Sequence, residues 1–254
     1  MSHTYLDLVN KVLVNLRENT VSAVNATSYS TLIGEFVNSA KETVEDSWRW
    51  RNLTTELSFT TVAGQVLYYL DNNVANTPLA TSSTGRFVDE RSYMLKDDRD
   101  SFMCFDTTLV SSLVLYQMSY VPRERATGDI YLAPGRTTTN PYLFTYTWEA
   151  NRPQFYMVNP PLGSRIIKSR WCIPQSEFIP GTDEATVLLC PWRPVISLAT
   201  ANSMRERGEE LGERADLYES RYNSELLRAQ ENDRAYGYDQ LIVDDAQSAA
   251  WSLS

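Results

Sequence analysis

The sequence predicts an α+β protein built from a discontinuous α-helical bundle, an inserted β-rich domain and an extended C-terminal arm. Three observations support this fold class. Apolar residues recur every three or four positions near the N-terminus, alternate with polar residues through the middle, and return to helical spacing near the end. We assign residues 1–53 and 191–234 to the bundle, 54–190 to the β-rich domain and 235–254 to the arm.

Two helices are predicted in the first part of the bundle. The first begins at Thr4, a residue type that caps helices, and its apolar stripe includes Val9 and Leu13. The second begins near Ser30, and its stripe is wide enough to pack against two neighbours. We expect three residues of this stripe to pack within the bundle or between subunits: Phe36, Val44 and Trp48.

Two tryptophans flank Arg49 where the second helix is expected to end. Trp48 and Trp50 offer rings that stack on a sugar or a base in some proteins, but such a pair is more typical of a helix end. We therefore expect Trp48 to close the core stripe, and Trp50 and Arg49 to cover the end of the helix.

Period-two alternation marks the strands of the β-rich domain. A first hairpin is predicted from residues 57–59 and 66–70, around a turn at Ala63-Gly64. A second is predicted from 142–148 and 154–158. The remaining elements are strands expected at 166–173, 87–94, 107–120 and 128–131, with a helix as the alternative for 107–120, and loops expected at 71–85 and 133–140.

Helical spacing returns at Pro194, which suits the first turn of a helix. Gly208 and Gly212 either divide this region into two helices or let another backbone approach closely. The stripe that follows contains further packing candidates, Tyr218, Tyr222 and Leu226. The last twenty residues are acidic and aromatic and too few to bury their own side chains. We expect them to dock on a partner, the alternative being that they fold back on the bundle.

Composition limits the classes of function. A net charge of −9 over 254 residues disfavours sequence-independent nucleic-acid binding and suits a surface past which DNA slides. The apolar fraction of 43% is typical of a folded soluble protein. No segment is long and apolar enough to cross a membrane, and no signal peptide is apparent. Cys104, Cys172 and Cys190 are expected to be free and mostly buried thiols.

Few residues suit catalysis, and we predict a non-enzymatic protein. The single histidine, His3, lies too near the terminus to be held rigidly. Clustered metal ligands and glycine-rich phosphate loops are missing from the sequence, so no metal or cofactor is expected. Paired acids serve glycosidases and Ca²⁺ sites, but adjacent acids usually point into solvent. The pairs are Asp97-Asp98, Glu209-Glu210 and Asp244-Asp245.

Three segments carry a family resemblance. They are the opening helix YLDLVNKVLVNL (residues 5–16), the second helix LIGEFVNSAKETVEDSWRW (32–50), and PWRPVI (191–196) continuing through RERGEELG (205–212). In order and spacing they resemble the head-to-tail adaptor (connector) proteins of short-tailed bacteriophages, of the tail tubular protein A type. The motifs are structural, and the β-rich segment matches that family only in general character.

The resemblance implies a structural virion protein at the head–tail junction, made in the cytoplasm of the host bacterium. Its copies would form a dodecameric ring between the capsid portal and the tail nozzle, and DNA would pass through without specific binding. No membrane would be involved. The β-rich domain would face the nozzle through its loops, 71–85 and 133–140. The arm would bind the portal through Tyr236, Tyr238, Leu241, Ile242, Val243 and Trp251.

Two alternatives remain at this point. One is another tail component, such as a tail terminator or a tube protein. The other is a virion-associated glycan hydrolase that uses acids of the β-rich domain.

Overall fold

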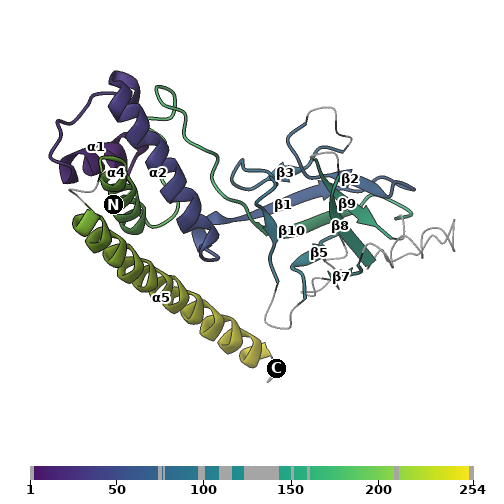
Figure 1. The fold of residues 1–254 in the computed structure, drawn as a ribbon. Helices are drawn as coiled ribbons and strands as arrows, with labels where there is room; N and C mark the ends of the chain where they lie inside the picture. Colours follow the sequence, from purple (N-terminus) through teal and green to yellow (C-terminus); the bar gives the residue numbers. More distant parts are fainter. Residues whose placement is uncertain are drawn as a thin grey trace. The chain divides into compact units, whose positions relative to one another are not determined.

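The computed structural model describes most of the chain as two compact units (Figure 1). Unit 1 comprises residues 1–53 and 175–254, and unit 2 comprises 54–174. The fold is α+β, with the helices described below in unit 1 and the strands in unit 2. The described residues are 3–73, 76, 78–96, 101–108, 116–122, 143–149, 152–158, 161–208 and 212–251, with the backbone alone described for 116, 212, 213 and 236–251.

Unit 1 begins with two capped helices. In α1 (Tyr5–Asn15) the Thr4 side chain accepts a hydrogen bond from the Asp7 amide, and the Asp7 side chain accepts one from Thr4, so the predicted cap is confirmed. A short 3₁₀ helix, η1 (Val24–Ala26), precedes α2 (Ser28–Asp46). Thr27 and Ser30 form the same reciprocal cap at the start of α2, so this helix starts slightly before its predicted position.

Side chains of α2 hold residues 175–178 against the helices. Lys41, only 1% exposed, donates from Nζ to the backbone oxygens of Gln175 and Ser176, at 2.7 Å each. Asn38 donates to the Phe178 oxygen at 2.9 Å and accepts from the Phe178 amide at 3.1 Å. Residues 175–190, predicted to belong to the β-rich domain, therefore lie in unit 1. The spacing of apolar residues does not predict this assignment, because hydrogen bonds from side chains of α2 to the backbone hold the segment in place.

Of the two tryptophans after α2, Trp50 covers the helix end as predicted, whereas the prediction that Trp48 closes the core stripe is wrong. Trp50 is 2% exposed and donates from Nε1 to the Val44 oxygen at 2.7 Å, so it seals the end of α2. Trp48 is only partly buried and donates from Nε1 to Asp233 at 3.1 Å. The reason is that α2 ends at Asp46, after which a turn and the 3₁₀ helix η2 (Arg51–Leu53) redirect the chain.

Two further helices complete unit 1: α4 (Trp192–Glu206) and α5 (Gly212–Trp251). Gly208, at φ +107°, lies just beyond the end of α4, so the glycines divide the region into two helices, the first of the two predicted alternatives. Along α5, Ala215 is fully buried, whereas Tyr218, Tyr222 and Leu226 are partly buried. On α2, Val44 is fully buried and Phe36 partly buried.

The prediction of an extended C-terminal arm is wrong for the backbone, because α5 continues to Trp251. No proline follows Pro194 to stop a helix, and Ala246, Ala249 and Ala250 have high helical propensity. The chain therefore ends in a helix of 40 residues, about 60 Å long at 1.5 Å per residue.

Unit 2 contains two sheets among its described residues. The first sheet has the order β3 (Thr81–Ser82), β1 (Thr54–Thr60), β10 (Ile166–Cys172), β5 (Cys104–Asp106), β6 (Tyr116–Gln117), with β4 (Tyr93–Met94) also paired to β10. The second has the order β2 (Leu67–Tyr69), β9 (Arg152–Met157), β8 (Leu143–Glu149), β7 (Ser119–Tyr120).

The second predicted hairpin is confirmed, and the first is wrong. Strands β8 and β9 pair antiparallel with Phe144 opposite Met157. Strand β1, however, pairs along its length with β10, and β2 pairs with β9 in the other sheet. The turn at Gly64 exists, with φ +77°, but the chain leaving it crosses between the sheets.

Other predicted elements of unit 2 differ in extent. The strand expected at 166–173 is confirmed as β10. In the segment 87–94 only Tyr93–Met94 is a strand, and the expected loop 71–85 contains β3. Around 107–120 the described residues form β5, β6 and β7. The elements predicted at 128–131 and 133–140 lie outside the described residues.

The two sheets of unit 2 share one aromatic core. Phe59 of the first sheet stacks on Tyr68 of the second, with ring centroids 4.8 Å apart. It also meets Phe155 at 5.2 Å, and Phe155 stacks on Phe144 at 5.0 Å. Such ring pairs add specific geometry to the burial of large apolar surfaces. Cys104, Cys172 and Cys190 are buried and form no disulfide within the described part of the chain, as predicted.

Candidate interaction surfaces

A groove of about 520 Å³ lies on unit 1 between α1, α4 and α5. We call it the Trp192 groove. Its apolar lining is Val14, Trp192 and Ile196, of which Val14 is 58% exposed. Its charged lining consists of three cations and two acids: Lys11, Arg193, Arg221, Asp7 and Glu225. The combination of apolar floor and charged rim is typical of a surface that binds another protein.

The acids of the Trp192 groove are already engaged. Asp7 accepts from the Thr4 amide in the α1 cap. Glu225 accepts from Arg221 Nε at 3.0 Å and from the Ser197 hydroxyl at 2.7 Å. Arg221 is therefore neutralised by Glu225, and neither acid is paired with the two remaining cations.

Lys11 and Arg193 contact the ring of Trp192 instead. Lys11 Nζ lies 4.4 Å from the ring centroid, and the Arg193 guanidinium carbon lies 5.3 Å from it. Neither cation pairs with a carboxylate within the described part of the chain. Cation–π contacts leave the charge uncompensated, so the groove keeps a positive surplus on an acidic protein.

His3 lies beside this positive charge. Its ring meets Trp192 edge-on, with centroids 4.4 Å apart. Burial, and then the charge of Lys11, lower the pKa of the imidazole below its usual value of 6.5. The predicted non-catalytic histidine thus takes part in the packing around Trp192.

A second groove of about 500 Å³ begins on the other side of Trp192 and is also lined by Trp50, Pro191, Ala229 and Asp233. Here α5 is fixed to the end of α2 by contacts that we call the α5 anchor. Trp48 donates to Asp233 as described, and the Arg234 guanidinium lies 5.4 Å from the Trp48 ring centroid. The Gln230 side chain donates to the Ser47 oxygen at 3.4 Å.

The residues predicted to bind the portal lie beyond the α5 anchor. For Tyr236, Tyr238, Leu241, Ile242, Val243 and Trp251 the structure describes a helical backbone, and their side chains lie outside the described part. From Arg234 to Trp251 the helix extends for about 25 Å at 1.5 Å per residue.

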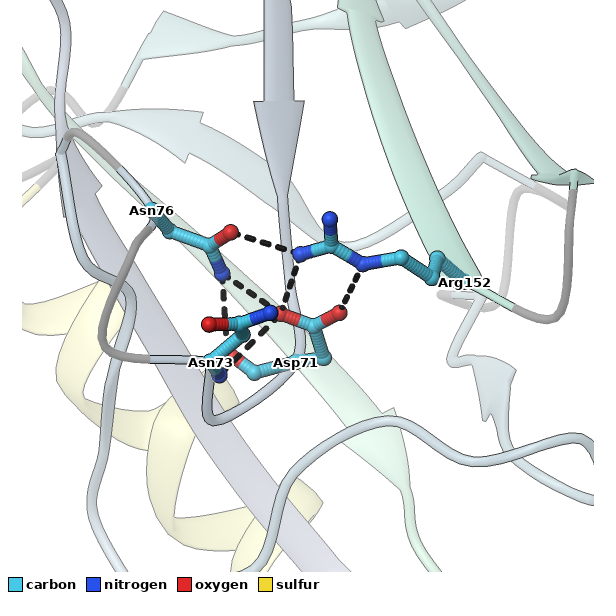
Figure 2. A network of polar contacts seen from close by, with 4 residues as sticks. All are labelled: Asp71, Asn73, Asn76 and Arg152. Carbon is cyan, nitrogen blue, oxygen red and sulfur yellow. Dashed lines mark hydrogen bonds and ion pairs between the residues drawn. The ribbon is translucent and has the colours of Figure 1, made fainter.

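In unit 2, a polar network fixes the base of the loop predicted to face the tail nozzle (Figure 2). Arg152 of β9 makes a bidentate ion pair with Asp71, at 2.6 Å from Nε and 3.0 Å from Nη2. The same Nη2 donates to Asn76 Oδ1 at 2.6 Å. The guanidinium also lies 3.9 Å from the Tyr69 ring centroid. The residues directly after β2 are therefore tied to the β8–β9 hairpin.

Three carboxylates of unit 2, those of Asp71, Asp106 and Glu56, form ion pairs. Hydrogen bonds from Arg152 are the largest cause of the lowered pKa of Asp71, which therefore stays ionised. Asp106, 1% exposed, pairs with Arg165 at 3.0 Å, and the exposed Glu56–Lys168 pair measures 2.7 Å. A glycosidase general acid has a raised pKa, whereas the ion pair with Arg152 shifts the pKa of Asp71 in the other direction.

Of the acid pairs predicted from the sequence, Asp97-Asp98 and Glu209-Glu210 lie outside the described residues, as do the side chains of Asp244-Asp245. Within the described part, no three His, Cys, Asp or Glu residues are grouped to hold a metal ion. In the same part, no helix has the length and apolar character needed to cross a membrane.

The Trp192 groove is the site that sequence reasoning missed. Lys11, Trp192 and Arg193 come from two helices far apart in the chain, so no local spacing brings them together. The only available signal was the adjacent pair Trp192-Arg193 at the start of a predicted helix.

Comparison with known proteins gives no family: no protein-family model matches the chain, and no curated protein matches it.

Proposed function

We propose that the protein is a structural virion protein, a head-to-tail adaptor of a short-tailed bacteriophage that forms a ring between the capsid portal and the tail nozzle. The observation that carries this proposal is the long helix α5. Its first half packs on α4 and is fixed by the α5 anchor, and its second half continues for about 25 Å with large apolar residues in sequence.

The C-terminal half of α5 suits a docking element. Residues 235–254 include Leu241, Ile242, Val243 and Trp251 and contain no lysine or arginine. Apolar anchors of this kind supply most of the binding energy at protein interfaces. By the resemblance of its helical segments to the adaptor family, the partner of this element is the portal.

The charge of the chain suits a conduit for DNA. With a net charge of −9, the protein repels phosphate at long range, so DNA moves past it without sequence-independent binding. Unit 2 then faces the tail nozzle, with its first loop held at the base by Arg152 and Asp71.

The proposal is tested by ending the chain after Arg234. This truncation keeps Gln230, Asp233 and Arg234 and therefore the α5 anchor. We expect the truncated protein to keep its helical circular dichroism, reduced only by the missing residues, and to lose co-sedimentation with cognate portal rings. Intact portal binding by the truncated chain would overturn the assignment of the portal site to this segment.

A pair of matched full-length variants sharpens the test. Leu241→Ser with Ile242→Ser is expected to weaken portal binding by at least about tenfold, since buried apolar anchors dominate interfaces. The control is Leu217→Ser with Leu227→Ser, which also replaces two large aliphatic residues by serine, at positions 67% and 61% exposed on α5. Equal losses in both variants would contradict a specific role for the C-terminal half. A full-length protein without affinity for the portal would overturn the adaptor proposal itself.

A further inference from the structure

Helix α5 is held on unit 1 by few buried side chains. Among its described side chains only Ala215, near its start, is fully buried, and the others on its inner face are partly buried. Leu217 and Leu227 are 67% and 61% exposed. The Trp192 groove and the second groove, of about 520 and 500 Å³, both lie along the helix, since residues of α5 line each of them. A helix with so little buried apolar surface depends on polar contacts for its position.

The contacts between α4 and α5 show where the support of α5 ends. The Ser197 hydroxyl of α4 donates to Glu225 at 2.7 Å, and Arg205 donates to Asp216 at 3.3 Å, so the two helices run antiparallel. In this register the first residue of α4 lies level with about residue 230 of α5. Beyond that level, the α5 anchor is the last polar contact of α5 with unit 1 within the described side chains.

Trp48 makes two of the three contacts of the α5 anchor. Its Nε1 donates to Asp233 at 3.1 Å, and the Arg234 guanidinium carbon lies over its ring, 5.4 Å from the centroid. The third contact joins Gln230 to the oxygen of the preceding residue, Ser47. A tilt of about 10° at this point would displace the end of α5, about 25 Å further on, by about 4 Å. The direction of the helix beyond unit 1 therefore depends on Trp48.

We propose that Trp48 is a positioning residue for portal binding: it sets the direction in which residues 235–251 leave unit 1, and thereby their affinity for the partner. Trp48 lies outside this segment and acts through α5. A helix that is already held in its bound orientation associates more tightly than one that is free to tilt, because less conformational entropy is lost on binding. This inference rests on the proposed function and adds how unit 1 controls the portal-binding segment.

Substitution on both sides of the α5 anchor tests the proposal. We expect Trp48→Ala to speed hydrogen exchange of residues 226–235, to leave exchange in α1 and α4 unchanged, and to weaken binding to cognate portal rings at least about tenfold. Gln230→Ala with Asp233→Ala breaks the anchor from α5 and should have the same effects. The matched control is Trp148→Ala, at a tryptophan 40% exposed on β8, which should change neither quantity. Circular dichroism checks that each variant folds.

Rescue by a covalent link separates positioning from a general loss of stability. In the Trp48→Ala background, Ser47→Cys with Gln230→Cys can be joined by a short bismaleimide, because the Gln230 side chain lies 3.4 Å from the Ser47 oxygen. The three native cysteines are buried and do not compete for the reagent. We expect the joined protein to regain portal affinity and the same protein without the link to stay weak.

Three results overturn the inference: unchanged exchange of residues 226–235 in Trp48→Ala, portal affinity of Trp48→Ala equal to that of the wild type, or a joined protein that stays weak. Each of them leaves the adaptor proposal standing, because the wild type still binds the portal. A wild type without portal affinity overturns the adaptor proposal and this inference together.

Discussion

One segment in each unit is fixed by polar side chains, which are buried in unit 1 and partly exposed in unit 2. In unit 1, the buried side chains Lys41 and Asn38 reach the backbone of residues 175–178. In unit 2, the loop after β2 is fixed by Asp71 and Arg152, whose side chains are 21% and 32% exposed. A buried group that loses its partner cannot turn to water, whereas a partly exposed one can. Removing Lys41 should therefore cost far more than removing Asp71 or Arg152.

The largest expected effect follows from Lys41→Met. The substitution keeps a long apolar side chain but leaves the backbone oxygens of Gln175 and Ser176 without their donor. We expect a loss of about 3 kcal/mol in the free energy of unfolding, since two buried charge-assisted hydrogen bonds are removed. Urea unfolding followed by far-ultraviolet circular dichroism measures it, because the described helices belong to unit 1.

The matched control for Lys41→Met is Lys168→Met in unit 2. Lys168 pairs with Glu56 at 2.7 Å, but both side chains are about two-fifths exposed, at 41% and 37%. A surface pair of this kind contributes about 0–1 kcal/mol. Equal costs for the two lysines would break the contrast between the units.

A smaller effect is expected from Gly34→Ala in α2. The added Cβ would overlap the hydroxyl of Tyr5 and crowd Val24. Overpacking of this kind costs about 1–3 kcal/mol. The Tyr5 hydroxyl is buried and makes no hydrogen bond in the described structure, so Tyr5→Phe alone should be nearly neutral.

The double variant Tyr5→Phe with Gly34→Ala is expected to recover part of the loss, because the nearest overlapping atom is gone. A double-mutant cycle in urea measures this coupling energy. Gly163→Ala in unit 2 is the control, since an added Cβ there meets no atom within 4 Å. Strictly additive effects of the two unit 1 changes would show that the Tyr5 hydroxyl is not the obstacle.

The sequence predicted local structure better than it predicted which distant segments of the chain contact each other. The caps of α1 and the β8–β9 hairpin follow from residues close in the chain. The pairing of β1 with β10 does not, because alternation shows which face of a strand is buried and says nothing of its neighbour. The same limit explains Trp48 and Trp50, whose roles depend on the residue at which α2 ends.

The candidate surfaces show this limit most clearly. Lys11 and Arg193 can be recognised as parts of one surface only in the folded structure, where α1 and α4 bring both cations to the ring of Trp192. The segment 175–190 joins unit 1 through hydrogen bonds from Asn38 and Lys41, which no apolar pattern reports. The C-terminal arm is predicted as extended because residues 235–254 are acidic and aromatic and too few to bury their own side chains, yet the helix α5 continues to Trp251.

The smallest expected effect is that of Asp71→Asn in unit 2, and it depends on pH. The folded pKa of Asp71 is lowered, first by its hydrogen bonds from Arg152, so the carboxylate stabilises the folded state above the unfolded pKa of about 4. That contribution is lost as the pH falls through the lower folded pKa. At pH 7 we expect the substitution to cost about 1 kcal/mol, as for a partly exposed ion pair.

Hydrogen exchange of the β8–β9 hairpin, with wild type and variant compared at each pH, measures this effect. The difference should be greatest at neutral pH and should vanish in acid, because the wild-type Asp71 then also lacks its charge. Arg152→Met should produce the same loss at neutral pH and the same decline of the difference in acid, since it removes the group that lowers the pKa of Asp71. In the Arg152→Met background, Asp71→Asn should have no further pH-dependent effect. A cost of Asp71→Asn that persists undiminished in acid would mean that the hydrogen-bond geometry of the side chain, rather than its charge, holds the loop.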